Sequence, residues 1–227
     1  MPTSTVEDYL KAILLEEQAL APGQLVTMGQ IASALDVAPG TVTAMVKTLE
    51  KSDLVAYEPY SGVRLSEEGR REAIHVLRRH RLIELFLVET LGLDWSEVHD
   101  EAEKLEHAIS DRLIDRIDEI LGYPKVDPHG DPIPTVAGEL QQKELVKLGS
   151  APRGEVVTVA RVSDQEETFL RFVEKHGLRP GAQVVLTHRD AIADAVTVEP
   201  IGRPPVTLGG ATAGKLWIEE PTAEDSP

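Results

Sequence analysis

The residues most able to do chemistry lie in two short stretches of the chain. One of them, residues 99–107, reads HDEAEKLEH and contains nothing that breaks a helix. At about 100° per residue, a helix over this stretch brings its histidines and two of its glutamates within roughly a third of a turn of one another. These side chains are His99, Glu103, Glu106 and His107. Upstream, His80 and Glu84 form a second histidine–carboxylate pair one helical turn apart.

Imidazoles and carboxylates crowded on one helical face are unfavourable unless a positive charge lies among them. A divalent cation is the usual positive charge in such a place. For either pair taken alone, a solvated charged face with incidental histidines is the simpler interpretation. Because two such pairs occur together, the sequence favours a metal site.

Composition narrows the class of protein. The chain has 227 residues and a formal net charge of −16, which argues against a polyanion binder with an overall basic surface. The acidic excess is densest in residues 73–138, which hold 7 basic and 14 acidic residues and include most candidate ligands. The absence of cysteine excludes a disulfide framework, a zinc knuckle and thiolate redox chemistry.

Nothing in the sequence predicts export or membrane insertion. The opening MPTSTVEDYL lacks the basic and apolar regions of a secretory signal. No apolar run approaches the roughly 20 residues that span a bilayer. We therefore expect a cytoplasmic protein with no membrane association.

The first part of the chain has the order of a winged helix-turn-helix. Apolar periodicity predicts three helices and a two-stranded hairpin, over residues 5–21, 27–34, 41–51, 54–57 and 63–65. In this fold the second helix of the pair enters the major groove of DNA by its N-terminal end. The candidates for DNA contact are Ala38, Pro39, Gly40, Thr41, Thr43 and Lys47 there, with Tyr60, Ser61 and Arg64 in the wing. The alternative is a small helical domain that uses this layout for packing or protein contact.

The rest of the chain divides into a helical and a β-rich region. Residues 70–121 are strongly helical and more apolar than one solvated helix needs, which favours a symmetric dimer and hence a palindromic DNA site. After residue 154 the pattern predicts short strands over 156–162, 184–187, 195–199, 206–208 and 216–219, with a helix over 166–176. This content is typical of a small, partly open barrel.

Several motifs, taken in order, resemble those of a known family. They are VEDYLKAI, VAPGTVTAMVKTLEK, RRHRLIELFL, HDEAEKLEH and GDPIP. Together they resemble the metal-dependent transcriptional repressors related to diphtheria toxin repressor and the manganese transport regulator, over nearly the whole chain. The segment GLRPGAQV is similar to the SH3-like, FeoA-type domain of the longer members.

Pattern and resemblance together imply a multi-domain protein, mainly α with a small β domain. The predicted parts are a winged helix-turn-helix DNA-binding domain (1–72), a helical metal-binding and dimerisation domain (73–138), a linker (139–150), an SH3-like, partly open barrel of the FeoA type (151–220) and a disordered tail (221–227). No catalytic residues are expected.

The resemblance also implies two metal sites. The primary site maps to Asp8, Glu103, Glu106 and His107; iron-responsive members have Met and Cys at the first two positions. The ancillary site maps to His80, Glu84 and His99, with further ligands from residues 163–168, namely Gln165 with Glu166 or Glu167. Lys11 is a departure, because short manganese regulators have Glu there. We therefore do not expect their closely spaced two-metal arrangement.

The implied function is repression switched by a metal effector. A cation bound by both the first helix and the 99–107 stretch ties the DNA-binding domain to the dimerisation domain, so metal selects the form that binds a palindromic operator as a homodimer. The oxygen and nitrogen ligands suit Mn²⁺ or Fe²⁺. We expect Mn²⁺ as effector, with Zn²⁺ or Co²⁺ able to substitute in vitro. An iron-responsive repressor of the same family is the alternative.

Other classes are less consistent with the sequence. A di-metal carboxylate enzyme needs a Glu-x-x-His motif on each of two helices, and none surrounds these ligands. An activator, or a metal-independent adaptor with the same fold, stays open. The remaining histidines lack a ligand-like partner set in the sequence and are interpreted as surface or structural residues; they are His75, His129, His176 and His188.

Overall fold

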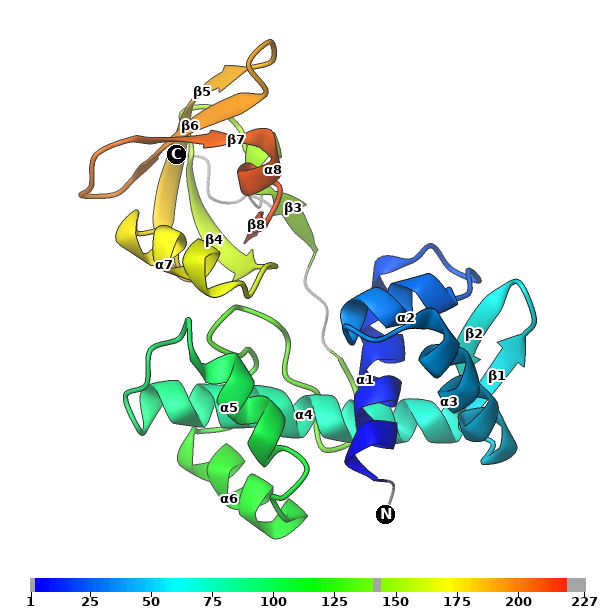
Figure 1. Cartoon of the computed structure of the whole chain (residues 1–227). Helices are drawn as coiled ribbons and strands as arrows, with labels where there is room; N and C mark the ends of the chain where they lie inside the picture. The colour runs from blue at the N-terminus through cyan, green and yellow to red at the C-terminus, as the bar shows by residue number, and fades with distance from the viewer. Residues whose placement is uncertain (1–2, 141–143, 220–227) are drawn as a thin grey trace. The chain divides into compact units, whose positions relative to one another are not determined.

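The computed structural model describes residues 3–140 and 144–219. The chain forms two compact units, and a division between them falls within helix α4 (Glu67–Glu89). Of the described residues, the first unit contains 3–80, 104–110 and 134–139, and the second contains 81–103, 111–133, 140 and 144–219. Figure 1 labels the elements of both units.

The first unit is the predicted winged helix-turn-helix. Its elements are α1 (Ser4–Ala19), α2 (Met28–Ala34), α3 (Pro39–Lys51) and an antiparallel hairpin of β1 (Val55–Glu58) and β2 (Gly62–Leu65). Their apolar faces form one core with the start of α4, in which Leu10, Ile31 and Val46 are fully buried. The prediction is confirmed, and each boundary lies within two residues of the predicted one.

Local signals explain where two of these helices begin. The backbone N–H of Gln30 donates to the Thr27 hydroxyl at 3.3 Å, and the Thr27 N–H donates to the Gln30 side chain at 3.0 Å, which is a capping box. Pro39 occupies the first position of α3, where its missing N–H removes no helical hydrogen bond. Helix α3 therefore begins two residues before the predicted Thr41.

The predicted helix over residues 99–107 is wrong at its end. Helix α5 (Val98–Leu105) ends at Leu105, and the N–H of Ala108 donates to the Leu105 carbonyl at 3.0 Å, which closes a turn. Glu106 is fully buried, and its contacts override the helix propensity of the stretch. The side chains predicted to share one helical face are thus divided between α5 and the turn that follows it.

The second unit contains α6 (Asp111–Ile120) and an antiparallel sheet with strand order β3-β8-β4-β5-β6-β7 (Figure 1). The strands are β3 (Leu145–Lys147), β4 (Val156–Val162), β5 (Gln183–Asp190), β6 (Ala195–Pro200), β7 (Val206–Gly209) and β8 (Leu216–Glu219). Helix α7 (Glu167–Lys175) follows β4, and the short helices are η1 (Leu148–Ser150) and α8 (Gly210–Ala213). The predicted strands and helix of this domain are confirmed.

Strand β3 and η1 lie in the segment predicted as a linker, residues 139–150. Because β3 pairs with β8, the end of that segment belongs to the sheet. The buried core of the sheet also includes Trp95, from the loop before α5. Residues 141–143 and the predicted tail lie outside the described residues. No helix in the described part of the chain has the length and apolar character needed to span a membrane.

Candidate metal centre

One group of candidate metal ligands is complete within the first unit. Asp8 comes from the start of α1, and Glu106 and His107 come from the turn after α5; one ligand atom of each lies within 4.8 Å of the others. The His107 Nε2 atom is 2.8 Å from Asp8 Oδ1 and 3.4 Å from Glu106 Oε1. Two carboxylates and an imidazole nitrogen at one point form a donor set that suits a divalent cation.

Glu106 is the buried member of this group, and its charge is balanced from two sides. Its Oε1 accepts from Lys11 Nζ at 2.7 Å, and its Oε2 lies 2.5 Å from His80 Nδ1. Burial raises the pKa of Glu106, but the His80 hydrogen bond and the Lys11 charge outweigh burial and hold the pKa below its usual value. Glu106 is therefore ionised at neutral pH, as a metal ligand must be.

This contact gives His80 a role that the sequence did not indicate. The prediction grouped His80 with Glu84 and His99 in the ancillary site. The structure places the His80 ring against Glu106 in the first unit. Sequence reasoning also passed over Lys11 as a structural partner of Glu106, because nothing in a lysine on an amphipathic helix indicates its target.

A second group of candidate ligands lies inside the second unit. Glu84 on α4 and two residues of the loop after α6, Asp127 and His129, are all buried, with one ligand atom of each within 4.8 Å of the others. Glu84 Oε2 lies 3.8 Å from His129 Nδ1, and Glu84 Oε1 lies 3.2 Å from His99 Nδ1. His129, interpreted from the sequence as a surface or structural residue, is buried in the structure and lies beside Glu84 and Asp127.

Burial dominates the electrostatics of this second group. Burial, together with the charges of Asp131 and Glu84, raises the pKa of Asp127 to about 7, against the opposing effect of Arg81. Asp127 Oδ2 is 3.7 Å from Arg81 Nε and has no hydrogen-bond partner among the described residues. Burial lowers the pKa of His129, but its contacts with Glu84 and Asp127 outweigh burial and raise it. A bound cation is one way to compensate such a buried carboxylate oxygen.

The remaining predicted ligands have contacts of their own in the second unit. On α5, Glu103 Oε1 lies 3.7 Å from His99 Nε2. At the start of α7, the Glu166 carboxylate caps the helix by accepting from two backbone N–H groups at 3.2 Å each, and Glu167 pairs with Arg171 at 2.9 Å. Ligand roles stay predictions for Glu103, Gln165, Glu166 and Glu167.

The predicted DNA-contacting residues lie at the start of α3 and in the wing. The exposed ones are Ala38, Pro39, Gly40, Thr41, Lys47, Tyr60, Ser61 and Arg64. Thr43 is half-buried, and its hydroxyl donates to the Pro39 carbonyl at 3.0 Å. The structure thus presents most of this set to solvent, and its contact with DNA stays a prediction.

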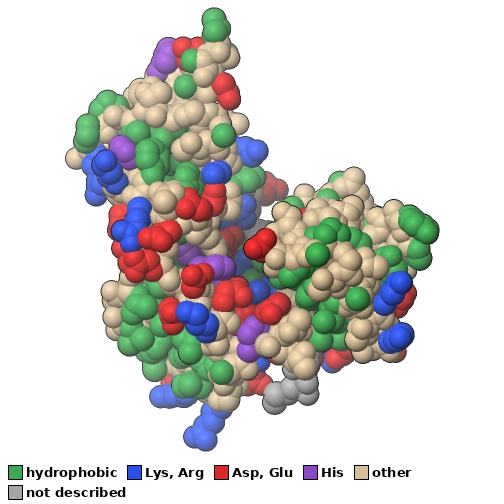
Figure 2. Space-filling model, viewed as in Figure 1, with side chains coloured by type: hydrophobic (Ala, Val, Ile, Leu, Met, Phe, Trp, Pro, Cys, Tyr) green, Lys and Arg blue, Asp and Glu red, His purple; other side chains and the backbone are tan. Residues whose placement is uncertain are grey.

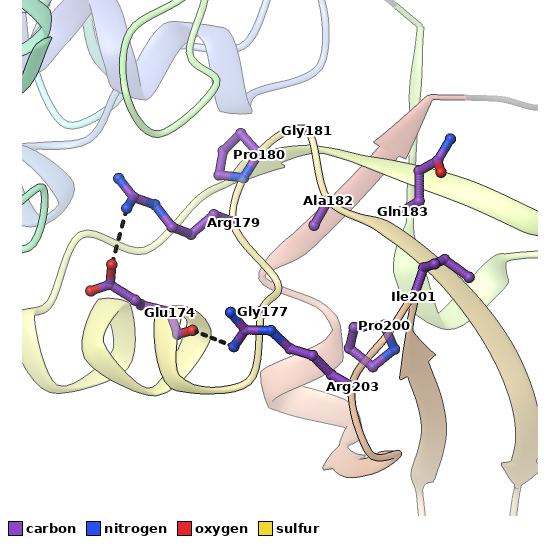
Figure 3. A pocket seen from close by; sticks show the side chains of 10 residues that line it. All are labelled: Glu174, Gly177, Arg179, Pro180, Gly181, Ala182, Gln183, Pro200, Ile201 and Arg203. Atoms are coloured by element: carbon purple, nitrogen blue, oxygen red, sulfur yellow. Dashed lines mark hydrogen bonds and ion pairs between the residues drawn. The ribbon is translucent and has the colours of Figure 1, made fainter.

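A separate pocket of about 570 Å³ in the second unit is lined by the end of α7, the loop before β5 and the loop after β6 (Figure 3). Its two arginines are engaged within the protein. Arg179 donates to the Glu174 carboxylate at 3.0 Å, and Arg203 donates to backbone carbonyls at the end of α7. None of the residues lining this pocket belongs to either ligand group.

Comparison with known proteins shows which protein family the chain resembles. Residues 1–63 match the N-terminal DNA-binding domain of iron-dependent repressors, residues 66–135 match their metal-binding and dimerisation domain, and residues 146–220 match the FeoA domain. The chain is 34% identical to a diphtheria toxin repressor of Corynebacterium efficiens, over 87% of this chain and 96% of the relative. It is 32% identical to the iron-dependent repressor IdeR of Mycobacterium tuberculosis, over 95% and 97%.

A solved structure described as a manganese-dependent transcriptional repressor in complex with manganese is similar, with a TM-score of 0.85 and 37% identity over 95% of this chain and 99% of that one. A winged DNA-binding domain beside a cluster of metal ligands defines the class, a metal-dependent transcriptional repressor and not an enzyme. The chain belongs to the iron-dependent repressor family. Members of this family bind operator DNA and dimerise through the second matched domain.

Proposed function

We propose that the chain is a manganese-responsive repressor in which Asp8, Glu106 and His107 bind the effector. The observation that supports this is the convergence of α1, the first helix of the DNA-binding domain, with the turn after α5 in the metal-binding domain. The donors are oxygen and nitrogen, and the chain has no cysteine to supply a thiolate. Carboxylate-rich sites of this kind suit Mn²⁺. Glu103 is the fourth ligand that the resemblance implies.

The bound cation acts on the placement of α1. Metal offsets the repulsion between Asp8 and Glu106 and holds α1 against the turn at residues 106–107. Without metal this restraint is lost, so the effector selects one placement from several. An Fe²⁺ ion in the same ligands has the same effect, and an iron-responsive repressor is therefore the alternative.

We also propose that the chain binds a palindromic operator as a homodimer. Large hydrophobic side chains are exposed in or near the part of the second unit that matches the dimerisation domain: Leu91, Leu93, Leu113, Ile120, Tyr123 and Val126. Figure 2 shows hydrophobic side chains gathered over α6. A two-fold dimer carries two copies of α3, one for each half-site of a palindrome.

The ancillary site is proposed around Glu84 and His99, with Asp127 and His129 as additional candidate ligands. Burial of three of these four side chains and their mutual distances support a site here. Because burial raises the pKa of Asp127 to about 7, a metal bound here competes with a proton at neutral pH.

Fluorescence anisotropy tests the proposed function. A labelled palindromic duplex from the region upstream of the chain's own gene is titrated in parallel with Mn²⁺, anaerobic Fe²⁺, Zn²⁺ and chelator. We expect tight binding with Mn²⁺ and none with chelator. Equal affinity in chelator and in excess Mn²⁺ contradicts metal-dependent repression. Activation by Fe²⁺ at a lower free concentration than Mn²⁺ supports the iron-responsive alternative.

A further inference from the structure

The imidazole ring of His107 is contacted at both of its nitrogens. Nε2 faces Asp8 at 2.8 Å, and Nδ1 lies 2.5 Å from Oε2 of Glu7. Glu7 is buried, and neither its type nor its spacing distinguished it from the other acidic residues of α1. Two consecutive residues of one helix thus contact opposite sides of the same ring.

The carboxylate of Glu7 is itself fixed by a cation. Arg79 of α4 donates from Nη2 to Glu7 Oε1 at 3.0 Å, and the two side chains are only 15% and 9% exposed. One oxygen of Glu7 therefore faces Arg79 and the other faces His107. Guanidinium, carboxylate and imidazole form one series of charge-assisted contacts that joins α4, α1 and the turn after α5.

We propose that Glu7 is the positioning residue of the metal centre, holding His107 so that Nδ1 carries the ring proton and Nε2 binds the metal. A carboxylate that accepts from one ring N–H fixes the tautomer and orientation of a ligating histidine and increases the basicity of the other nitrogen. Glu7 acts through His107, because both of its own oxygens are engaged. This inference rests on the proposed function, since it takes His107 as a ligand.

The geometry makes an unusual prediction for Glu7→Gln. Arg79 is a donor only, so the carbonyl oxygen of the new amide turns toward it. The NH₂ group of Gln then faces Nδ1 of His107 as a donor, and the ring proton moves to Nε2. We expect this nearly isosteric change to reverse the tautomer and to lower Mn²⁺ affinity by about 10–100-fold.

The test uses the full chain labelled with ¹⁵N in histidine. Two-bond ¹H–¹⁵N spectra of the ¹¹³Cd²⁺-loaded protein show which ring nitrogen of His107 keeps its proton, and coupling to ¹¹³Cd²⁺ shows which nitrogen binds metal; His107→Ala assigns the signals. In the wild type we expect the proton on Nδ1 and cadmium on Nε2. Cadmium on Nδ1 overturns the proposal. Cadmium binding without any coupling to His107 instead contradicts the metal site on which the proposal rests.

Variants complete the test, with Mn²⁺ affinity measured by calorimetry. Glu16→Gln is the matched control, because Glu16 is a half-buried residue of α1 that accepts from Gln30 at 2.9 Å; it should leave tautomer and affinity unchanged. Glu7→Ala should give a mixture of tautomers, and if it fails to fold, Glu7→Gln decides alone. A folded Glu7→Gln protein with the wild-type tautomer overturns the positioning role, even if its affinity is lower, because only the charge of Glu7 then matters.

Discussion

The two ligand groups of this repressor use the same residue types but differ in how their charge is balanced. In the first group, the His80 hydrogen bond and the Lys11 ammonium, 2.7 Å from Glu106, hold the pKa of that carboxyl below its usual value. In the second, the nearest guanidinium atom, Arg81 Nε, is 3.7 Å from Asp127 Oδ2, and burial raises the pKa of Asp127 to about 7. The two carboxyl groups thus differ in two ways: Glu106 has direct side-chain hydrogen bonds from His80 and Lys11, whereas Asp127 is buried beside the acidic side chains Asp131 and Glu84.

This difference gives the two groups different responses. The first group presents an ionised carboxylate at neutral pH, so its metal affinity needs no deprotonation of Glu106. A metal bound by the second group would have to displace the Asp127 proton near neutral pH. We therefore expect Glu106 to add no pH dependence to metal binding at the first group near neutral pH, and Asp127 to add one at the second.

The largest expected effect comes from deleting a ligand of the first group. His107→Ala should abolish Mn²⁺-activated DNA binding. The loss of Mn²⁺ affinity should exceed the roughly 10–100-fold that is typical when a residue behind a metal ligand is mutated. His80→Ala should weaken activation less, because His80 contacts Glu106 at its second oxygen. Anisotropy with operator DNA measures both, and His75→Ala, on the exposed face of α4, is the control. A normal Mn²⁺ response of His107→Ala would show that the first group is not the effector site.

The next effect tests the counter-ion that distinguishes the groups. Lys11→Met removes the ammonium from a fully buried carboxylate, and breaking a buried pair in this way costs about 3–5 kcal/mol of unfolding free energy. Excess Mn²⁺ should restore part of this loss, since it binds the native state. Urea denaturation with and without Mn²⁺ measures both quantities, with the exposed Lys51→Met as control. A loss below about 1 kcal/mol would mean that His80 alone balances Glu106.

The pH dependence of stability should have opposite signs in the two groups. Asp127 has an unfolded pKa of about 3.9 and a folded pKa of about 7, so its contribution is complete below pH 4 and is lost as pH rises toward 7. His129, with a raised pKa, acts in the same direction. Glu106, with a lowered pKa, contributes above its unfolded pKa and loses that contribution in acid.

For the metal-free chain we expect the unfolding free energy to fall by about 2 kcal/mol between roughly pH 5.5 and pH 7 because of Asp127. Asp127→Asn keeps the oxygen that accepts from the loop N–H groups and removes the titration, so most of this slope should disappear. Urea denaturation across this pH range is the measurement. An unchanged slope in Asp127→Asn would assign the pH dependence to His129 instead.

The parts of the fold that could be predicted have local signals. The capping box at Thr27 and the alternation in residues 156–162 are both contained within a few residues, and both elements lie where the sequence predicts them. The end of α5 could not be predicted in this way, because residues 99–107 all favour helix. In the turn that follows α5, Glu106 contacts Lys11, which is 95 residues away in the sequence, and His80.

The same distinction applies to the candidate site. Asp8, Glu106 and His107 were identified through the resemblance, and the structure brings them together. The residues that support these ligands were missed. An ion pair such as that of Arg79 with Glu7 joins two different helices and leaves no repeating pattern in the sequence. The neighbours of His129 were missed for a related reason, since Glu84 lies on another element.

The smallest expected effect concerns metal preference, where the two groups are alike in having only oxygen and nitrogen donors. Asp8→Met combined with Glu103→Cys adds soft donors to the first group alone and leaves the second unchanged. Sulfur ligands favour later metals over Mn²⁺, so the free-metal midpoint should move toward Fe²⁺ or Co²⁺ relative to Mn²⁺ by on the order of tenfold, or about 1.4 kcal/mol. Anaerobic anisotropy with buffered free metal measures the order. If the wild type responds to Fe²⁺ before Mn²⁺, or the double variant keeps the wild-type order, the hardness of these ligands does not set metal selectivity, and coordination geometry must.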